Sequence, residues 1–304
     1  MTSQKSEKSY YGPFFWIAAV SFLVPIFVAV RAFDHIGATA GPTPVPDASG
    51  VDHALWDYAL KAYVTNGLVD YDGMAKDQAF RTYLKQLGAA QPDKLATDDE
   101  RLALLCNAYN AFVISGVIRH DIRDSVNNYS DPATKKGFFD IPEYIFANET
   151  LSLNDIEHKK IREPFGDPRI HVALVCAALS CPAIRQEAFE GARLDAQLDD
   201  QSRLFANDPK HVAYDAEKNE IRLSRILQWY GEDWDASGGY LAWLHERVED
   251  PAIKEALMKA AAKEVAVKYF EYDWVLNTSN ELKPGGSADP STGAFGSGSI
   301  PNEG

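Results

Sequence analysis

Side chains that can carry nucleophilic chemistry concentrate in the segment HVALVCAALSCP at residues 171–182, which holds two of the three cysteines of the chain. An imidazole that takes the proton of a nearby thiol produces a thiolate, the nucleophile of acyl transfer. We therefore predict a thiol site with Cys181 or Cys176 as the nucleophile and His171 as one candidate base. The backbone N–H groups of residues 177–182 would supply its oxyanion hole.

Glu157 and His158 form a second polar pair, on a short helix expected at 153–162 with Ser152 and Asp155 as its cap. His158 is the alternative base for the thiol. Neighbouring residues on a helix do not face each other, so Glu157 is not expected to orient His158. Glu157 is instead a candidate to orient His171, as a carboxylate does in catalytic triads.

Two asparagines interrupt an apolar helix that is expected to run from Thr97 to about His120. Thr97 and Glu100 have the spacing of a capping box, which marks the start of this helix. Asn107 and Asn110 share one face of it. A buried amide without a partner costs about 1–3 kcal/mol, so both side chains must be hydrogen-bonded. Either they join the helix to its neighbours, or they support a polar site and orient its histidine.

Two further interpretations fit the same residues. His158, His171, Cys176 and Cys181 are ligand types that suit zinc, although their spacing is not that of a CxxC pair. Alternatively, Cys176 and Cys181 form a disulfide in an oxidising compartment, and the histidines are hydrogen-bonded in the core. The domain would then be a non-catalytic binding or scaffold domain. No other cofactor is expected.

Residues 170–176 are apolar at alternating positions on both faces, which predicts a strand buried on both sides. Successive side chains of a strand point to opposite faces, so His171 and Cys176 are expected to point apart. Cys181 lies beyond the following turn and has no such constraint. The alternation therefore favours Cys181 as the nucleophile, or His158 as the partner of the thiol.

The composition is that of a globular protein with an acidic surface. Hydrophobic residues make up 46% of the 304 residues, which is enough for a sizeable core. The formal net charge is -14. Nucleic-acid binders need Lys and Arg to displace counterions from phosphate, so the charge argues against that class of partner. Three cysteines are too few for a disulfide scaffold.

The composition also changes along the chain and predicts five regions. They are a polar, cytoplasmic N-terminus at 1–10, an apolar transmembrane anchor or signal segment at 11–30, a linker rich in Gly, Pro and Ala at 31–50, a globular domain at 51–278, and a disordered tail at 279–304.

The segment 11–30 has about the 20 residues that a helix needs to cross a bilayer. The nearest A-x-A pattern of a signal-peptide cleavage site, at 38–40, lies rather far downstream. We therefore expect an uncleaved anchor and an exported domain in the cell envelope, on the periplasmic or extracellular side. A cleaved signal and a secreted domain are the alternative.

Within the domain, the hydrophobic pattern predicts mostly helices. Besides the one from Thr97, we expect them near 52–66, 76–88, 187–206, 238–248 and 251–263. A hairpin is expected at 211–214 and 220–223, and a closing strand at 265–275. The aromatic residues between 229 and 243 are expected in the core. The fold class is therefore α+β, a helix-dominated single domain around a small buried sheet, with an N-terminal membrane helix.

Several short motifs resemble the DUF547 domain family in their order and spacing: VDY at 69–71, NAYN at 107–110, LSLNDIEH at 151–158, DPRIHVALVCAALSCPAIR at 167–185 and YDWVLN at 272–277. The resemblance covers about residues 52–277. Two marks of the family carry over to this chain: the Glu157-His158 pair, and the segment with His171, Cys176 and Cys181. The chain departs from the family at Cys106, where an aliphatic residue is more usual, and at residues 175–177, where Asn-Cys-Gly is more typical.

The family name stands for an unknown function, so the resemblance implies the domain and not its activity. From the residues, we expect a thiol-dependent hydrolase or acyltransferase that acts on a peptide-like or amide substrate in the cell envelope. Its partners would be the membrane, through residues 11–30, and that envelope substrate, with no nucleic acid.

Overall fold

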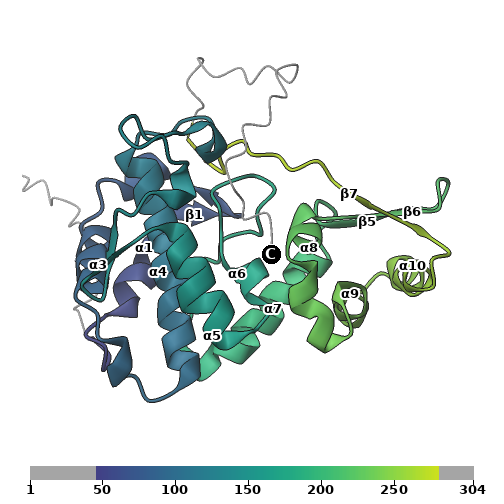
Figure 1. Ribbon diagram of the computed structural model, residues 1–304, viewed down its shortest axis with the longest axis horizontal. Helices are drawn as coiled ribbons and strands as arrows, with labels where there is room; N and C mark the ends of the chain where they lie inside the picture. Colours follow the sequence, from purple (N-terminus) through teal and green to yellow (C-terminus); the bar gives the residue numbers. More distant parts are fainter. Residues whose placement is uncertain (1–45, 281–304) are drawn as a thin grey trace, which may run out of the picture. The chain divides into compact units, whose positions relative to one another are not determined.

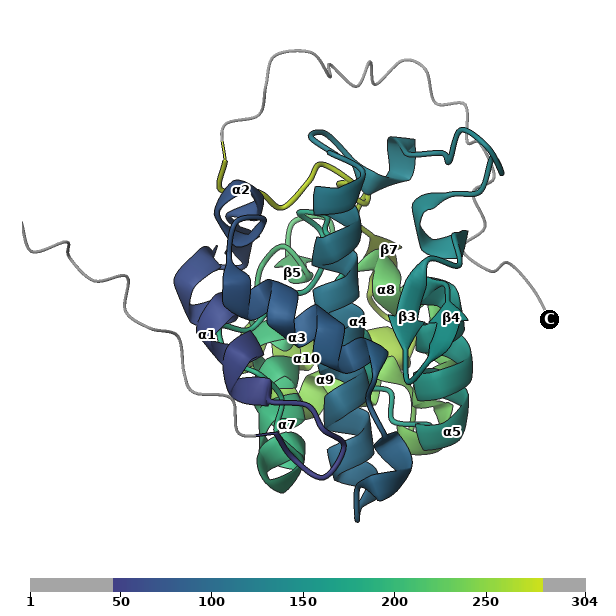
Figure 2. The ribbon, with the colours of Figure 1, turned by 90° about the vertical axis from the view of Figure 1, so that its left-hand side faces the viewer.

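Helix α4 (Asp98–Arg119) is the element around which the other helices pack. The computed structural model describes residues 46–280. The expected capping box is present: the Thr97 hydroxyl accepts the N–H of Glu100 at 3.1 Å, and the Glu100 carboxylate accepts the N–H of Thr97 at 3.0 Å. Every residue from Leu102 to Val117 is buried. Such a helix needs neighbours on all sides, and α4 contacts elements from both earlier and later parts of the chain (Figure 2).

Three α-helices and a short 3₁₀ turn precede α4: α1 (His53–Tyr63), α2 (Tyr71–Met74), α3 (Gln78–Gly88) and η1 (Pro92–Lys94). Each α-helix follows an aspartate whose side chain accepts a backbone N–H of the first turn, namely Asp52, Asp70 and Asp77. The antiparallel strands β1 (Val64–Thr65) and β2 (Leu68–Val69) lie between α1 and α2. Their turn, Asn66-Gly67, has positive φ at both residues, as a tight hairpin turn requires.

The chain after α4 is built from short elements: η2 (Val126–Asn128), η3 (Phe138–Asp140), β3 (Tyr144–Phe146), β4 (Glu149–Leu151), η4 (Asp155–Arg162) and α5 (Glu163–Phe165). The helix expected at 153–162 is present, and most of it is the π-helix η4. The N–H of Glu163 bonds to the carbonyl of His158, five residues back. π-Turns are rare and frequently occur at functional sites.

The prediction of a strand at 170–176 is wrong. Residues Ile170–Ala173 form a helical turn, α6, and the chain becomes extended only from Leu174. The turn starts because the N–H groups of Ile170 and His171 bond to the carbonyls of Asp167 and Pro168. A short apolar run fits a buried helical turn as well as a strand, so the pattern alone did not separate them. The strand alternation that placed His171 and Cys176 on opposite faces therefore does not apply.

The remaining elements are η5 (Gly191–Arg193), α7 (Leu194–Ala206), β5 (Val212–Asp215), β6 (Glu220–Leu223), α8 (Arg225–Trp229), η6 (Gly231–Ser237), α9 (Tyr240–Arg247), α10 (Pro251–Ala261) and β7 (Ala266–Tyr269). The expected hairpin is confirmed, with β5 antiparallel to β6, and β7 lies parallel to β6 on its other side. The closing strand ends at Tyr269, earlier than expected, and the following residues run on without regular structure.

The buried apolar side chains form two clusters. The first surrounds α4 and draws on residues 51–198 together with Leu276. The second lies among α7–α10 and the β5–β6–β7 sheet and contains Trp234 and Trp243, two of the aromatic residues expected in the core. In Figure 1 the chain after β7 runs back from the second group of elements toward the first, where Leu276 is buried.

The α+β class is confirmed as a mixture of helices and small sheets. The expected architecture is wrong in one respect, because the centre is helix α4 and not a buried sheet. The N-terminus, the apolar segment 11–30 and nearly all of the linker and tail lie outside the described residues. Within 46–280, α4 is the one helix long and apolar enough to cross a membrane, and 89% of its apolar window is buried, as in a core helix.

Candidate functional site

A pocket of about 430 Å³ lies where the two hydrophobic clusters meet. Leu174 of the first cluster and Ile226 of the second both line it. Its volume falls in the range of small-molecule sites, about 300–1,000 Å³. Four of the residues singled out from the sequence line this pocket: Glu157, His171, Cys176 and Cys181.

His171 is held by groups that the sequence analysis missed. Its Nε2 lies 2.6 Å from a carboxylate oxygen of Asp233, and its ring stacks on Tyr230 with the centroids 4.1 Å apart. Arg162 donates two hydrogen bonds of 2.7 Å to the same carboxylate. Burial disfavours the charged form of Asp233, but the hydrogen bonds from His171 and Arg162 outweigh it and hold the pKa of the carboxyl below its usual value. A carboxylate accepts only, so Nε2 of His171 is the donor and Asp233 fixes the tautomer.

Cys176 and Cys181 form a disulfide, with Cα atoms 6.1 Å apart. The hydroxyl of Tyr272 lies 3.0 Å from Sγ of Cys176 and 3.3 Å from Sγ of Cys181. The N–H of Cys176 points at Sγ of Cys181 from 2.9 Å. Within residues 46–280, no imidazole hydrogen-bonds to either sulfur. The structure therefore shows the disulfide interpretation of these two residues, and neither sulfur is a free thiol.

Three aromatic side chains, Trp229, Tyr272 and Trp274, form what we call the aromatic wall of the pocket. Trp229 comes from the end of α8, and the other two come from the irregular chain after β7. The ring centroids of Trp229 and Tyr272 are 4.8 Å apart, and those of Tyr272 and Trp274 are 4.7 Å apart. Each side chain is only partly buried, so the wall offers apolar ring surface to a ligand.

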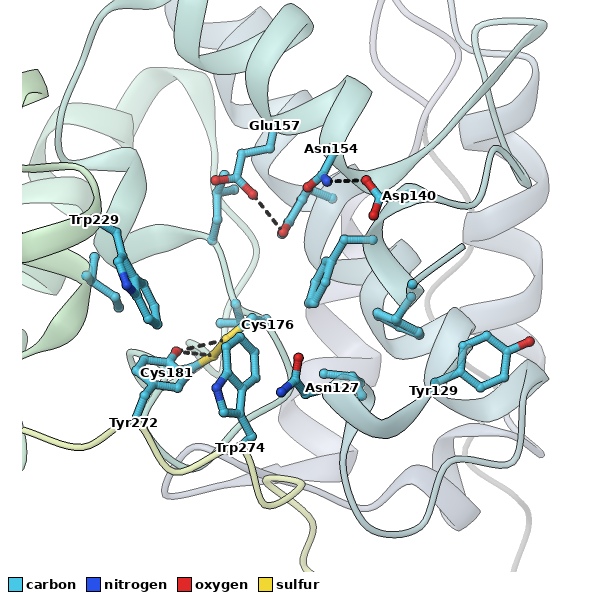
Figure 3. A pocket seen from close by; sticks show the side chains of 18 of the residues that line it. Asn127, Tyr129, Asp140, Asn154, Glu157, Cys176, Cys181, Trp229, Tyr272 and Trp274 are labelled. Atoms are coloured by element: carbon cyan, nitrogen blue, oxygen red, sulfur yellow. Dashed lines mark hydrogen bonds between the residues drawn. A yellow bond between two sulfur atoms is a disulfide. The ribbon is translucent and has the colours of Figure 1, made fainter. Parts of the chain in front are cut away.

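Glu157 reaches the pocket from η4, apart from the disulfide and the aromatic wall (Figure 3). It is 9% exposed, and the hydroxyl of Tyr109 donates to its carboxylate at 2.9 Å. Burial raises the pKa of Tyr109 and of Tyr230, and the charge of Glu157 raises both further. Among the residues that the structure describes, no basic side chain pairs with Glu157. The carboxylate thus has tyrosine hydroxyls as its polar neighbours.

The two asparagines of α4 have separate roles. Asn110 donates to the carbonyl of Ala173 at 3.0 Å and accepts the N–H of Val175 at 2.9 Å, so it fixes the chain that leads into Cys176. Asn107 makes the corresponding pair of bonds to the backbone of Phe189, outside the pocket. Of the two interpretations, Asn110 therefore fits support of the site, and Asn107 fits packing of the helix against a loop.

His158 is not among the side chains that line the pocket, and its Nε2 is buried without a hydrogen-bond partner. No group of three or more His, Cys, Asp or Glu side chains within residues 46–280 is arranged to hold a metal ion. The zinc interpretation of His158, His171 and the cysteines therefore finds no ligand group in the described part of the chain.

The sequence analysis missed most of the pocket. Trp229 and Tyr230 were expected in the core, yet both line the pocket. Tyr272 and Trp274 lie in the YDWVLN motif at 272–277, whose repeated aromatics were the available signal. Asp233 gave no signal, because a single acidic residue in a polar stretch is usually solvated.

Residues 92–206 match the model of a family described as a protein of unknown function, DUF547. The match includes Glu157, His171 and both cysteines of the disulfide, and it confirms the resemblance for this part of the chain. The motifs at 69–71 and 272–277 lie outside the matched residues, so the wider extent of 52–277 stays a prediction. No curated protein and no solved structure matched the chain.

Proposed function

We propose that this chain is a ligand-binding domain whose pocket takes a small molecule with an aromatic or peptide-like group. The aromatic wall of Trp229, Tyr272 and Trp274 is the observation that carries the proposal. Ligand pockets are mostly apolar and aromatic with a few placed polar groups, and here Glu157 and the tyrosine hydroxyls are the polar groups.

The disulfide supports binding over catalysis. Acyl transfer by cysteine requires a thiolate, and a disulfide sulfur has none. The bond instead joins the two ends of the turn at 176–181, which helps to hold this side of the pocket in one shape. A preformed pocket lowers the entropy cost of ligand binding.

Thiol-dependent hydrolysis or acyl transfer is a second proposal, for the reduced form of the same site. It is favoured by the N–H of Cys176 and the hydroxyl of Tyr272, which both point at Sγ of Cys181 and would stabilise a thiolate there. His171, fixed by Asp233, would be the proton carrier. Iodoacetamide labelling at neutral pH tests this proposal: after mild reduction Cys181 should react, and Tyr272→Phe should slow its labelling. Reduced protein whose Cys181 stays unlabelled would rule it out.

Export of the domain is also a proposal, since residues 11–30 lie outside the described part of the chain. The disulfide supports it, because disulfides persist in oxidising compartments and are rare in the cytosol. In the cell, the membrane would then be a partner through residues 11–30, and the ligand would come from the envelope. Topology mapping with a periplasmic reporter fused after residue 280 tests this, and a reporter active only in the cytosol would contradict it.

Three probes of similar size test ligand binding: 2-phenylethylamine, N-(2-phenylethyl)acetamide and 3-phenylpropionate. Binding is measured by titration calorimetry on the oxidised protein. We expect at least one of them to bind, and Trp229→Ala to weaken that binding about two- to tenfold, since an aromatic contact is worth about 0.5–1.5 kcal/mol. Leu204→Ala is the control, because Leu204 is 57% exposed on α7 and does not line the pocket. No binding at millimolar concentration, or equal binding to Trp229→Ala, would refute the proposal.

A further inference from the structure

Glu157 is a buried carboxylate with no cationic partner among residues 46–280. Its side chain lies in the wall of the pocket, it is 9% exposed, and Tyr109 is its hydrogen-bond donor at 2.9 Å. Buried charges in proteins are normally paired, because removing an ion from water is costly. The described part of the chain supplies no Lys, Arg or His to Glu157. Glu157 lines the pocket, so a cationic ligand there can supply a counter-charge that the described residues do not.

The other charged side chains of the pocket do not fill this role. His171 is already bonded to Asp233, and Arg162, which does not line the pocket, bonds to Asp233 as well. Lys135 is exposed in a turn, where water screens its charge. Asp140 adds a second negative charge, and its carboxylate accepts a hydrogen bond from Asn154 at 2.7 Å. The pocket lining thus contains two carboxyl side chains, Asp140 and Glu157.

The aromatic wall is also suited to a cation. The faces of Trp and Tyr rings attract cations through their quadrupoles, and this attraction is strongest for Trp in desolvated sites. Trp229 and Trp274 flank Tyr272. The pKa of the Tyr272 hydroxyl is raised, first by burial and second by the negative charge of Glu157. Glu157 and the three side chains of the wall line the same pocket, so one ligand can contact both.

We infer that the ligand of this pocket is a small cationic amine, an ammonium ion attached to an aromatic or apolar group. The ammonium group would bond to the carboxylate of Glu157, and its apolar body would lie on the aromatic wall. A peptide N-terminus or an arylalkylamine has this chemistry. The inference rests on the proposed ligand-binding function and names its ligand class.

The same three probes separate the inference from the function, because they share a phenyl group and differ in charge. On the wild-type protein we expect 2-phenylethylamine to bind at least about tenfold more tightly than the neutral N-(2-phenylethyl)acetamide and the anionic 3-phenylpropionate, since hydrogen bonds to charged groups contribute most. Glu157→Gln keeps the shape of the side chain and an oxygen for Tyr109. It should remove this preference, so that the amine binds no more tightly than the acetamide does.

Glu149→Gln is the matched control, because Glu149 pairs with Lys160 on the surface and lies outside the pocket. It should bind all three probes like the wild type. If the acetamide binds wild type as tightly as the amine does, the inference is overturned while the ligand-binding function stands. If the amine keeps its preference in a folded Glu157→Gln variant, Glu157 is not the cation site and the inference is overturned. If no probe binds, the proposed function fails, and the inference fails with it.

Discussion

At the scale of single residues, Asn110 links the central helix to the chain that carries the disulfide. Its amide satisfies the carbonyl of Ala173 and the N–H of Val175. Asn110→Ala leaves both buried groups without partners, each costing about 1–3 kcal/mol. We expect a lower midpoint in urea unfolding with an unchanged slope. Asn128→Ala, which loses one exposed hydrogen bond to Asp124, is the control. Equal stability of Asn110→Ala and wild type would contradict the role assigned to Asn110.

Asp233 gives the stability a pH dependence. Its folded-state pKa lies below its ordinary value because the hydrogen bonds from His171 and Arg162 outweigh burial. Such a carboxyl contributes stability that is present above its unfolded pKa, about 3.9, and is lost as the pH falls through the folded pKa. The stability difference between wild type and Asp233→Asn should therefore be largest above about pH 5 and shrink below pH 4. Urea unfolding from pH 7 to pH 3 measures it, and a difference that stays constant over this range would rule the mechanism out.

The sequence predicted that Asn107 and Asn110 are hydrogen-bonded, because burial in an apolar helix makes this necessary. It did not predict their partners. Ala173 is 63 residues from Asn110 along the chain, and Phe189 is 82 residues from Asn107. Such bonds form only when the tertiary structure brings distant backbone segments to the helix, and nothing in the local pattern encodes which segment that is.

At the scale of elements, the capping and turn signals were reliable, whereas the apolar run at 170–176 was not. The capping box of Thr97 and Glu100 and the hairpin of β5 and β6 depend on residues within a few positions of each other, and both are present. Residues 170–176 instead fold as α6 and an extended segment, since the turn at Asp167 and the amide of Asn110 take their backbone groups. Hydrophobicity sets burial, but the partners of the backbone decide between helix and strand.

The turn closed by the disulfide also makes a testable contribution to stability. The bond spans five residues, and closing so short a loop stabilises the folded state by about 2 kcal/mol in the chain-entropy model. The double variant Cys176→Ser, Cys181→Ser should lose about this much free energy of unfolding. Wild type should lose a similar amount in reductant, whereas the variant should not respond to it. A wild type that is equally stable with and without reductant would contradict a structural contribution of the bond.

At the scale of the whole molecule, the pocket joins parts of the chain that no local pattern connects. Tyr109, Glu157, Trp229 and Trp274 come from α4, η4, α8 and the chain after β7. Each of them fits ordinary core packing when considered alone, and the order of motifs along a sequence contains no distances between them. The polar and aromatic character of the site therefore became visible only when the two hydrophobic clusters were placed against each other.

The chain after β7 connects the two hydrophobic clusters. The N–H of Leu276 bonds to the carbonyl of Asp124 at 2.7 Å, and its side chain is 3% exposed in the first cluster. Asn277 accepts the hydroxyl hydrogen bond of Tyr71 at 2.7 Å, and its backbone pairs with Val69 and Ala177. Tyr272 and Trp274 of the aromatic wall precede these contacts. Positioning of the wall thus depends on how firmly residues 276–277 are held.

Leu276→Ala tests this dependence without removing any residue from the pocket. Truncating a buried leucine costs about 2–5 kcal/mol, so urea unfolding should show a loss in this range. Because Leu276 anchors the segment that bears the wall, the variant should also bind the preferred probe amine more weakly, measured at a temperature where circular dichroism shows it folded. Deletion of residues 281–304 is the control, since it removes none of these contacts. Wild-type stability and affinity in Leu276→Ala would show that the wall is positioned by other contacts, whereas a loss in the deletion variant would place part of the anchor beyond residue 280.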